Sequence, residues 1–230
     1  MRFCRGSLLL LAVLAIPEWA MGQDTRLGIA VLAFENGGSY GQDKEDFTAL
    51  ERGIPGMLIS ELSRHPDARL VDRGETQRLL DEQDLAAGGR IDAATAARIG
   101  KMLGARYMVF GTFIDVYGEF RVDARIVDVE SSEILHVATA NNNREQLYHI
   151  IQDIADQILA DVELPPLPAA VGQARVPRDV PTDALTYYSR ALLYQDRGDK
   201  AQATEFYRRA LEVFPDYTEA QEGLRHVESS

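Results

Sequence analysis

Histidine and cysteine are the side chains that most often bind metal, and this 230-residue chain has few of them. The four histidines are His65, His136, His149 and His226, and the single cysteine is Cys4. They are widely scattered, whereas zinc sites are recognised from close spacings such as two histidines four residues apart on a helix. The sequence therefore predicts no metal site.

The motifs of nucleophilic and phosphate chemistry are also missing from the sequence. There is no G-x-S-x-G elbow, no phosphate loop ending in Gly-Lys-Ser or Gly-Lys-Thr, and no G-x-G-x-x-G after the first predicted strand. A glycine-rich loop, Gly37 to Gly41, does follow that strand, but no basic residue occurs before Lys44. We interpret the loop as a flexible connection.

Neighbouring carboxylates could in principle supply an acid and a base, as in the pairs Asp81 with Glu82 and Asp128 with Glu130. Such pairs are expected by chance in a chain with 36 acidic residues. We therefore expect no catalytic residues, no cofactor and no enzymatic activity. A ligand-binding or hydrolytic domain is an alternative, and it would use the carboxyl ends of the strands near Phe34 and Asp72.

Residues 1–22 have the three zones of a secretory signal peptide: Arg2 and Arg5, then an apolar stretch from Ser7 to Ile16, then small residues up to Gly22. The apolar stretch is about half of what a bilayer span requires. Cleavage after Gly22, or alternatively after Ala20, would leave 22 basic and 35 acidic residues, a net charge of −13, and no cysteine. We expect a periplasmic protein without an integral membrane span, and its charge argues against nucleic acid as a partner.

Residues 23–163 are predicted to form an α/β domain. An apolar run, Leu27 to Phe34, has the composition of a strand buried on both faces. A helix over 47–62 follows, in which Pro55 marks either a kink or the true start, and then a short strand over 68–72. This order predicts a parallel crossover unit, followed by helices over 75–83 and 92–104.

The second half of this domain is predicted to be a β meander closed by a helix. Three strands over 107–113, 120–128 and 134–139 are separated by breaks short enough for antiparallel hairpins. In the middle strand Val122, Ala124 and Ile126 alternate with polar residues. An apolar stripe from Leu147 to Val162 should then cover one sheet face.

Four phrases in this order resemble the family of the curli secretion channel CsgG: Val31–Asn36, Leu70–Arg73, Leu79–Gln83 and Ile99–Tyr107. The resemblance covers residues 26–160, and the same core is similar to the amino-terminal domain of TolB. It implies a mixed sheet with flanking helices in a periplasmic protein that assembles with envelope machinery.

The resemblance does not extend to the membrane pore of the curli channel. A membrane hairpin needs roughly twenty residues, and the breaks at Gly118 and Ser131 are too short to hold one. The meander strands carry Asp123, Arg125 and Asp128, which do not suit a lipid face.

Residues 164–182 are predicted to be a proline-rich linker, and residues 183–228 a small all-α module. Ala184 to Tyr217 spans 34 residues, the period of a tetratricopeptide repeat, with Gly198 at the turn between two helices. Because about three repeats are usually needed for stability, this single one should pack on the α/β domain, on a second copy of the chain or on a partner.

Exposed positions of such a repeat could bind protein, and Tyr188, Arg190, Arg197 and Arg208 are either such a contact surface or simply solvated. Together these features predict a periplasmic adapter that helps a cell-envelope complex to assemble through protein–protein binding. A soluble, ring-forming accessory of a curli-type export system is an alternative, and a homo-oligomer is possible in either case.

Overall fold

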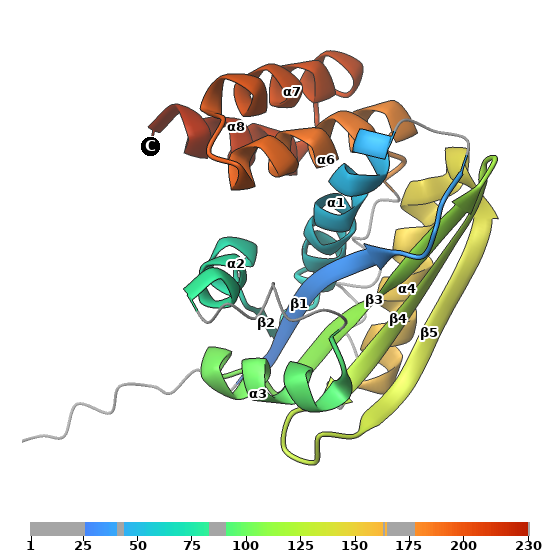
Figure 1. Cartoon of the computed structure of the whole chain (residues 1–230), viewed down its shortest axis with the longest axis vertical. Helices are drawn as coiled ribbons and strands as arrows, with labels where there is room; N and C mark the ends of the chain where they lie inside the picture. Colours follow the sequence, from blue (N-terminus) through green and yellow to red (C-terminus); the bar gives the residue numbers. More distant parts are fainter. Residues whose placement is uncertain (1–25, 41–43, 83–90, 163, 165–177, 230) are drawn as a thin grey trace, which may run out of the picture.

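The computed structural model describes residues 26–40, 44–82, 91–162, 164 and 178–229. The predicted signal peptide and residues 165–177 of the predicted linker lie outside these residues. The described part contains a five-stranded mixed sheet with helices on both faces and a helical module beside it (Figure 1). The predicted fold class is confirmed.

The sheet has the strand order β2-β1-β3-β4-β5. Strand β1 pairs in parallel with β2 and β3, and the remaining pairs are antiparallel. The strands are β1 (Leu27–Asn36), β2 (Ala68–Leu70), β3 (Tyr107–Val116), β4 (Glu119–Asp128) and β5 (Ile134–Asn143). The parallel crossover and the two hairpins are therefore where the sequence predicted them.

Two pairs of helices cover the sheet. Helices α1 (Lys44–Leu62) and α4 (Leu147–Asp161) pack on one face, and α2 (Arg73–Glu82) and α3 (Ala93–Leu103) on the other. In β4, Val122, Ala124 and Ile126 are buried against the α1 and α4 side, as their alternation predicted. Pro55 lies inside α1, so the helix starts well before it.

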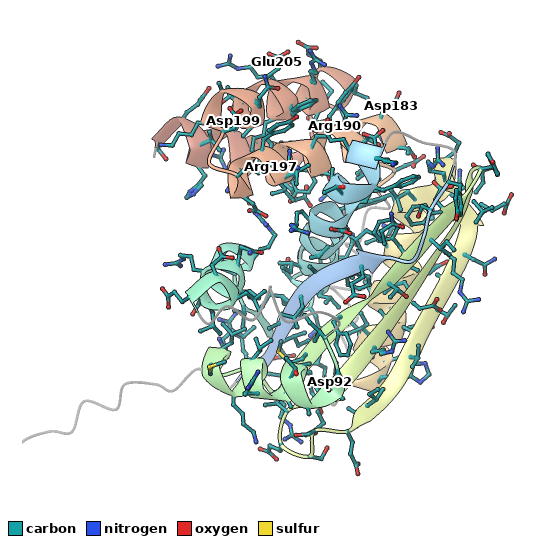
Figure 2. All side chains as sticks on the ribbon, in the orientation of Figure 1. Asp92, Asp183, Arg190, Arg197, Asp199 and Glu205 are labelled. Carbon is teal, nitrogen blue, oxygen red and sulfur yellow. The ribbon has the colours of Figure 1, made fainter. Side chains whose placement is uncertain are left out.

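Helix α3 shows how local sequence sets the ends of an element. The Asp92 carboxylate accepts a hydrogen bond from the backbone N–H of Thr95 at 2.8 Å and caps the first turn (Figure 2). Gly104 ends the helix in the left-handed region with φ 62°, which a residue without Cβ adopts at no steric cost. Both ends were predicted from these two residues.

The helical module consists of α6 (Thr182–Asp196), α7 (Lys200–Val213) and α8 (Thr218–Ser229). Gly198 has φ 76° at the turn between α6 and α7, and the small Ala191, Ala203 and Ala210 are buried between the helices. Buried side chains of this module and of the α1 and α4 side of the sheet form one hydrophobic cluster. The repeat thus packs on the α/β domain, which was the first of the three alternatives that the sequence left open for it.

No helix in the described part of the chain is both long enough and apolar enough to cross a bilayer.

Candidate functional site

The two modules meet where α6 lies across α1, at two glycines of α1. A Cβ built on Gly53 would lie 1.8 Å from the Ser189 Oγ, and one built on Gly56 would lie 2.8 Å from the Tyr188 hydroxyl. Such distances are impossible for a real side chain, so only glycine allows the two helices to approach this closely. We call this contact the glycine seam.

Ion pairs flank the glycine seam on both sides. Arg73 at the start of α2 holds Asp196 at the end of α6 through two parallel hydrogen bonds of 2.8 and 2.9 Å. At the start of α1, Arg190 of α6 donates to Asp46 at 2.6 Å and lies 3.3 Å from Glu45. Bidentate and charge-assisted bonds of this kind fix orientation as well as adding energy.

The four side chains that the sequence offered as a contact surface have different surroundings. Tyr188 is buried on α1, Arg190 pairs with Asp46, and the guanidinium of Arg197 lies 3.8 Å from Glu45 (Figure 2). Arg208 instead pairs within the helical module, with Glu228 of α8. Three of the four therefore form a contact surface within the chain itself.

A partly buried polar network ties α8 to α1 and α4. Glu219 of α8 accepts two hydrogen bonds from Arg178, at 3.0 and 2.7 Å, and one from Ser60 of α1. Burial alone would raise the pKa of the Glu219 carboxyl, but these hydrogen bonds lower it below its ordinary value. Nearby, the Tyr148 hydroxyl donates a hydrogen bond to Glu61 at 2.5 Å. The pKa of Tyr148 is raised, mainly by burial and to a smaller extent by this hydrogen bond.

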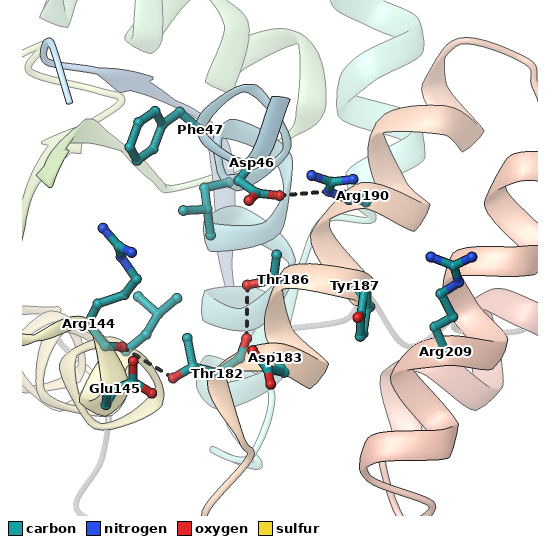
Figure 3. A pocket seen from close by; sticks show the side chains of 12 residues that line it. Asp46, Phe47, Arg144, Glu145, Thr182, Asp183, Thr186, Tyr187, Arg190 and Arg209 are labelled. Atoms are coloured by element: carbon teal, nitrogen blue, oxygen red, sulfur yellow. Dashed lines mark hydrogen bonds and ion pairs between the residues drawn. The ribbon is translucent and has the colours of Figure 1, made fainter. Parts of the chain in front are cut away.

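A cavity of about 370 Å³ lies among the first turns of α1, α4 and α6, near the Arg190–Asp46 ion pair (Figure 3). Its cations are already paired: Arg144 with the buried Asp115, Arg190 with Asp46, and Arg209 with Glu205 at 2.9 Å. This arrangement completes the joint between the modules, and the pairing leaves none of these three cations to bind an anionic ligand.

A larger hollow lies between α2 and the helical module. Two adjoining cavities of about 440 and 350 Å³ share Arg73, Gly74, Gln195 and His226, and so form one groove. We call it the seam groove. Both modules line it, with Ser60 of α1, Ser63 just after α1, Gln77 of α2 and Glu222 of α8. Its size and its mixture of apolar and polar lining residues suit a peptide segment of a protein partner.

The structure leaves the residues considered for chemistry apart. Phe34 is fully buried, whereas Asp72, which follows β2, lines the seam groove. In the described residues, no three His, Cys, Asp or Glu side chains gather as a metal site would need. Asp128 pairs with Arg106 at 2.7 Å and caps the turn after β4.

The loop after β1 differs from its interpretation as a flexible connection. Over residues 37–40 it is held by hydrogen bonds: Asn36 Oδ1 accepts from the N–H groups of Gly38 and Ser39, and Ser39 Oγ accepts from the N–H of Asp115. Tyr40 forms a parallel bridge with Val116 at the end of β3. The glycines gave no signal of this, because the partners lie about 75 residues further along the chain.

Comparison with known families agrees with this architecture. Residues 20–119 match the family model of the curli production assembly/transport component CsgG, and residues 184–217 match that of the tetratricopeptide repeat. The chain therefore contains a CsgG-family domain followed by a tetratricopeptide repeat, as the sequence motifs predicted. A search of curated proteins finds no match.

Three solved structures show similar folds at low identity. The LpoB C-terminal domain from Escherichia coli is 14% identical over 54% of this chain and 87% of its own, with a TM-score of 0.39. TolB from Acinetobacter baumannii is 18% identical over 58% and 28%, with a TM-score of 0.37. The PelC dodecamer from Paraburkholderia phytofirmans is 14% identical over 62% and 91%, also with a TM-score of 0.37.

Proposed function

We propose that this protein is a non-catalytic periplasmic adapter that binds a protein of a cell-envelope complex in the seam groove. The observation that carries the proposal is the groove itself, because the CsgG-family domain and the tetratricopeptide repeat both line it. A partner segment lying there would contact both modules at once, so its binding would depend on their relative position.

The seam supports this function by fixing the two walls of the groove. The Arg73–Asp196 pair joins α2 to α6, and the Arg178–Glu219 pair with Ser60 joins α8 to α1. A groove that is already formed spares its ligand the cost of ordering the walls.

The experiment is affinity purification of the processed chain, tagged at Ser230, from detergent-solubilised envelopes, followed by mass spectrometry. Deleting a whole module is a poor test, because the modules share one core. We use Glu222→Lys, which reverses an exposed charge in the groove, and Glu212→Lys as the matched control on the exposed surface of α7.

We expect the unaltered chain and Glu212→Lys to recover the same envelope protein, and Glu222→Lys to recover much less of it. Recovery of no envelope protein by the unaltered chain would refute the adapter function. Equal recovery by all three chains would refute the assignment of the groove.

A further inference from the structure

Two exposed tyrosines stand together at the end of the β3–β4 hairpin. Tyr117 is 82% exposed, Tyr40 is 64% exposed and Val116 between them is 43% exposed. The backbone N–H of Tyr117 donates to the carbonyl of Tyr40 at 3.2 Å, so the two aromatic residues are neighbours across the hairpin end. We call residues 37–40 and 116–119 the hairpin platform.

Hydrogen bonds and an ion pair of the buried residue Asp115 fix the position of the hairpin platform. Its carboxylate accepts a hydrogen bond from the N–H of Gly118 at 2.9 Å and forms an ion pair with Arg144. The carbonyl of Asp115 accepts from Tyr40 at 2.7 Å, and that of Gly118 accepts from Arg144 at 2.6 Å. Surfaces fixed in this way lose little conformational entropy when they bind.

A tyrosine at position 117 is energetically unfavourable for the backbone of this turn. Its φ of 53° and the φ of 98° at Gly118 are both positive, the geometry of a tight hairpin turn in which Asn-Gly is the preferred pair. A bulky residue in this region is an outlier. The exposed ring gains little from packing, so the fold alone does not account for a tyrosine at position 117.

We propose that the hairpin platform is a second docking surface of the adapter, and that it binds a protein with an apolar recess rimmed by Lys and Arg side chains. Tyrosine is enriched among the residues that dominate binding energy, and its ring face attracts cations. The platform and its surroundings are acidic: next to the platform Arg144 is neutralised by Asp115, while Glu119 of the platform and the neighbouring Glu145 are exposed. An anionic membrane surface would be repelled by the same charges.

This inference rests on the proposed function and adds a second surface to it. Figure 1 shows the β3–β4 hairpin end and the pair α2 and α8 on opposite sides of α1. The platform and the seam groove can therefore be occupied at the same time, which is what an adapter that joins two proteins requires.

The test uses Tyr117→Asn, which places the preferred turn residue at position 117 and removes the ring. We expect the variant to melt no lower than the unaltered chain, yet to bind a purified platform partner at least about tenfold more weakly in titration calorimetry. Tyr117→Phe, which keeps the ring, should retain most of the affinity. Val213→Asn, at an exposed apolar residue of α7, is the matched control and should bind unchanged.

The partner is identified by photo-cross-linking from p-benzoylphenylalanine placed at position 117 or, as control, at position 213. A protein adduct specific to position 117, mapped to a segment rich in Lys and Arg, would support the proposal. An adduct with lipid, an adduct with a second copy of the chain, or equal adducts from both positions would overturn it. If the unaltered chain recovers its groove partner while position 117 gives no protein adduct, only this inference fails; if it recovers no envelope protein, the proposed function fails first.

Discussion

Replacing Gly53 with alanine should weaken the contact between the two modules. In an exposed helix this substitution would add stability, because alanine is a better helix former than glycine. In α1 the new Cβ would lie 1.8 Å from the Oγ, 2.6 Å from the Cβ and 3.2 Å from the Cα of Ser189. Rotating the serine side chain cannot relieve overlap with its Cβ and Cα, so α6 must move away.

The expected magnitude follows from two opposing effects. Helix propensity contributes about 1 kcal/mol in favour of alanine. Overpacking costs about 1–3 kcal/mol, and the overlap with Cβ and Cα atoms puts this site at the upper end. The free energy of unfolding should therefore fall by about 2 kcal/mol, which for a chain of this size lowers the melting temperature by about 4–8 °C.

The assay is thermal and urea unfolding of the processed chain followed by circular dichroism. The double variant Gly53→Ala with Ser189→Gly should lose less free energy of unfolding than the two single variants lose together. The reason is that Ser189→Gly removes the side-chain atoms nearest to the new Cβ at position 53. Gly74→Ala is the control, since only the Asp72 carboxylate lies near its Cβ position. A Gly53→Ala chain as stable as the original would refute our account of the seam.

Three further predictions concern charged groups. Asp115→Asn leaves Arg144 without its buried partner and should cost about 3–5 kcal/mol in urea unfolding, in contrast to Glu119→Gln on the exposed turn. The pKa of Glu219 is lower in the folded than in the unfolded chain, so its ionisation stabilises the fold above the unfolded pKa, and this contribution is lost as the pH falls through the folded pKa. Below the ordinary glutamate pKa of 4.5, the melting temperature should fall less steeply with pH in Glu219→Gln than in the unaltered chain, and an unchanged slope would contradict the assignment. Asp92→Ala should lower the melting temperature by removing the cap of α3, whereas Asp92→Asn, which can also cap, should not.

Elements with a local signal could be predicted from the sequence. The Asp92 cap, the left-handed Gly104 and the alternation of β4 each depend on residues close together in the chain, and each was found where expected. The repeat signal of Ala184 to Tyr217 coincides with the residues that match the tetratricopeptide model. These patterns reflect backbone preferences and helical or strand periods, which need no knowledge of the rest of the fold.

The seam and the hairpin platform could not be predicted, because they depend on residues far apart in sequence. In α1 the sequence drew attention to Pro55, whereas Gly53 and Gly56 determine how closely α6 approaches. The sequence left open whether Tyr188 and Arg190 are a contact surface or solvated, and only the position of α1 shows that Tyr188 is buried and that Arg190 pairs with Asp46. Glycines within a helix signal a close contact without saying with what.

The glycine seam also has a consequence for the order in which the chain can fold. The chain is synthesised from its amino terminus, and Arg190 is added 144 residues after its partner Asp46. Until α6 emerges, the surface of α1 around Gly53 and Gly56 has nothing to cover it, and an exposed apolar surface of this kind is what chaperones bind. Any factor that protects the nascent chain should therefore leave only when α6, which begins at Thr182, has been synthesised, and truncation before α6 should give a protein that aggregates.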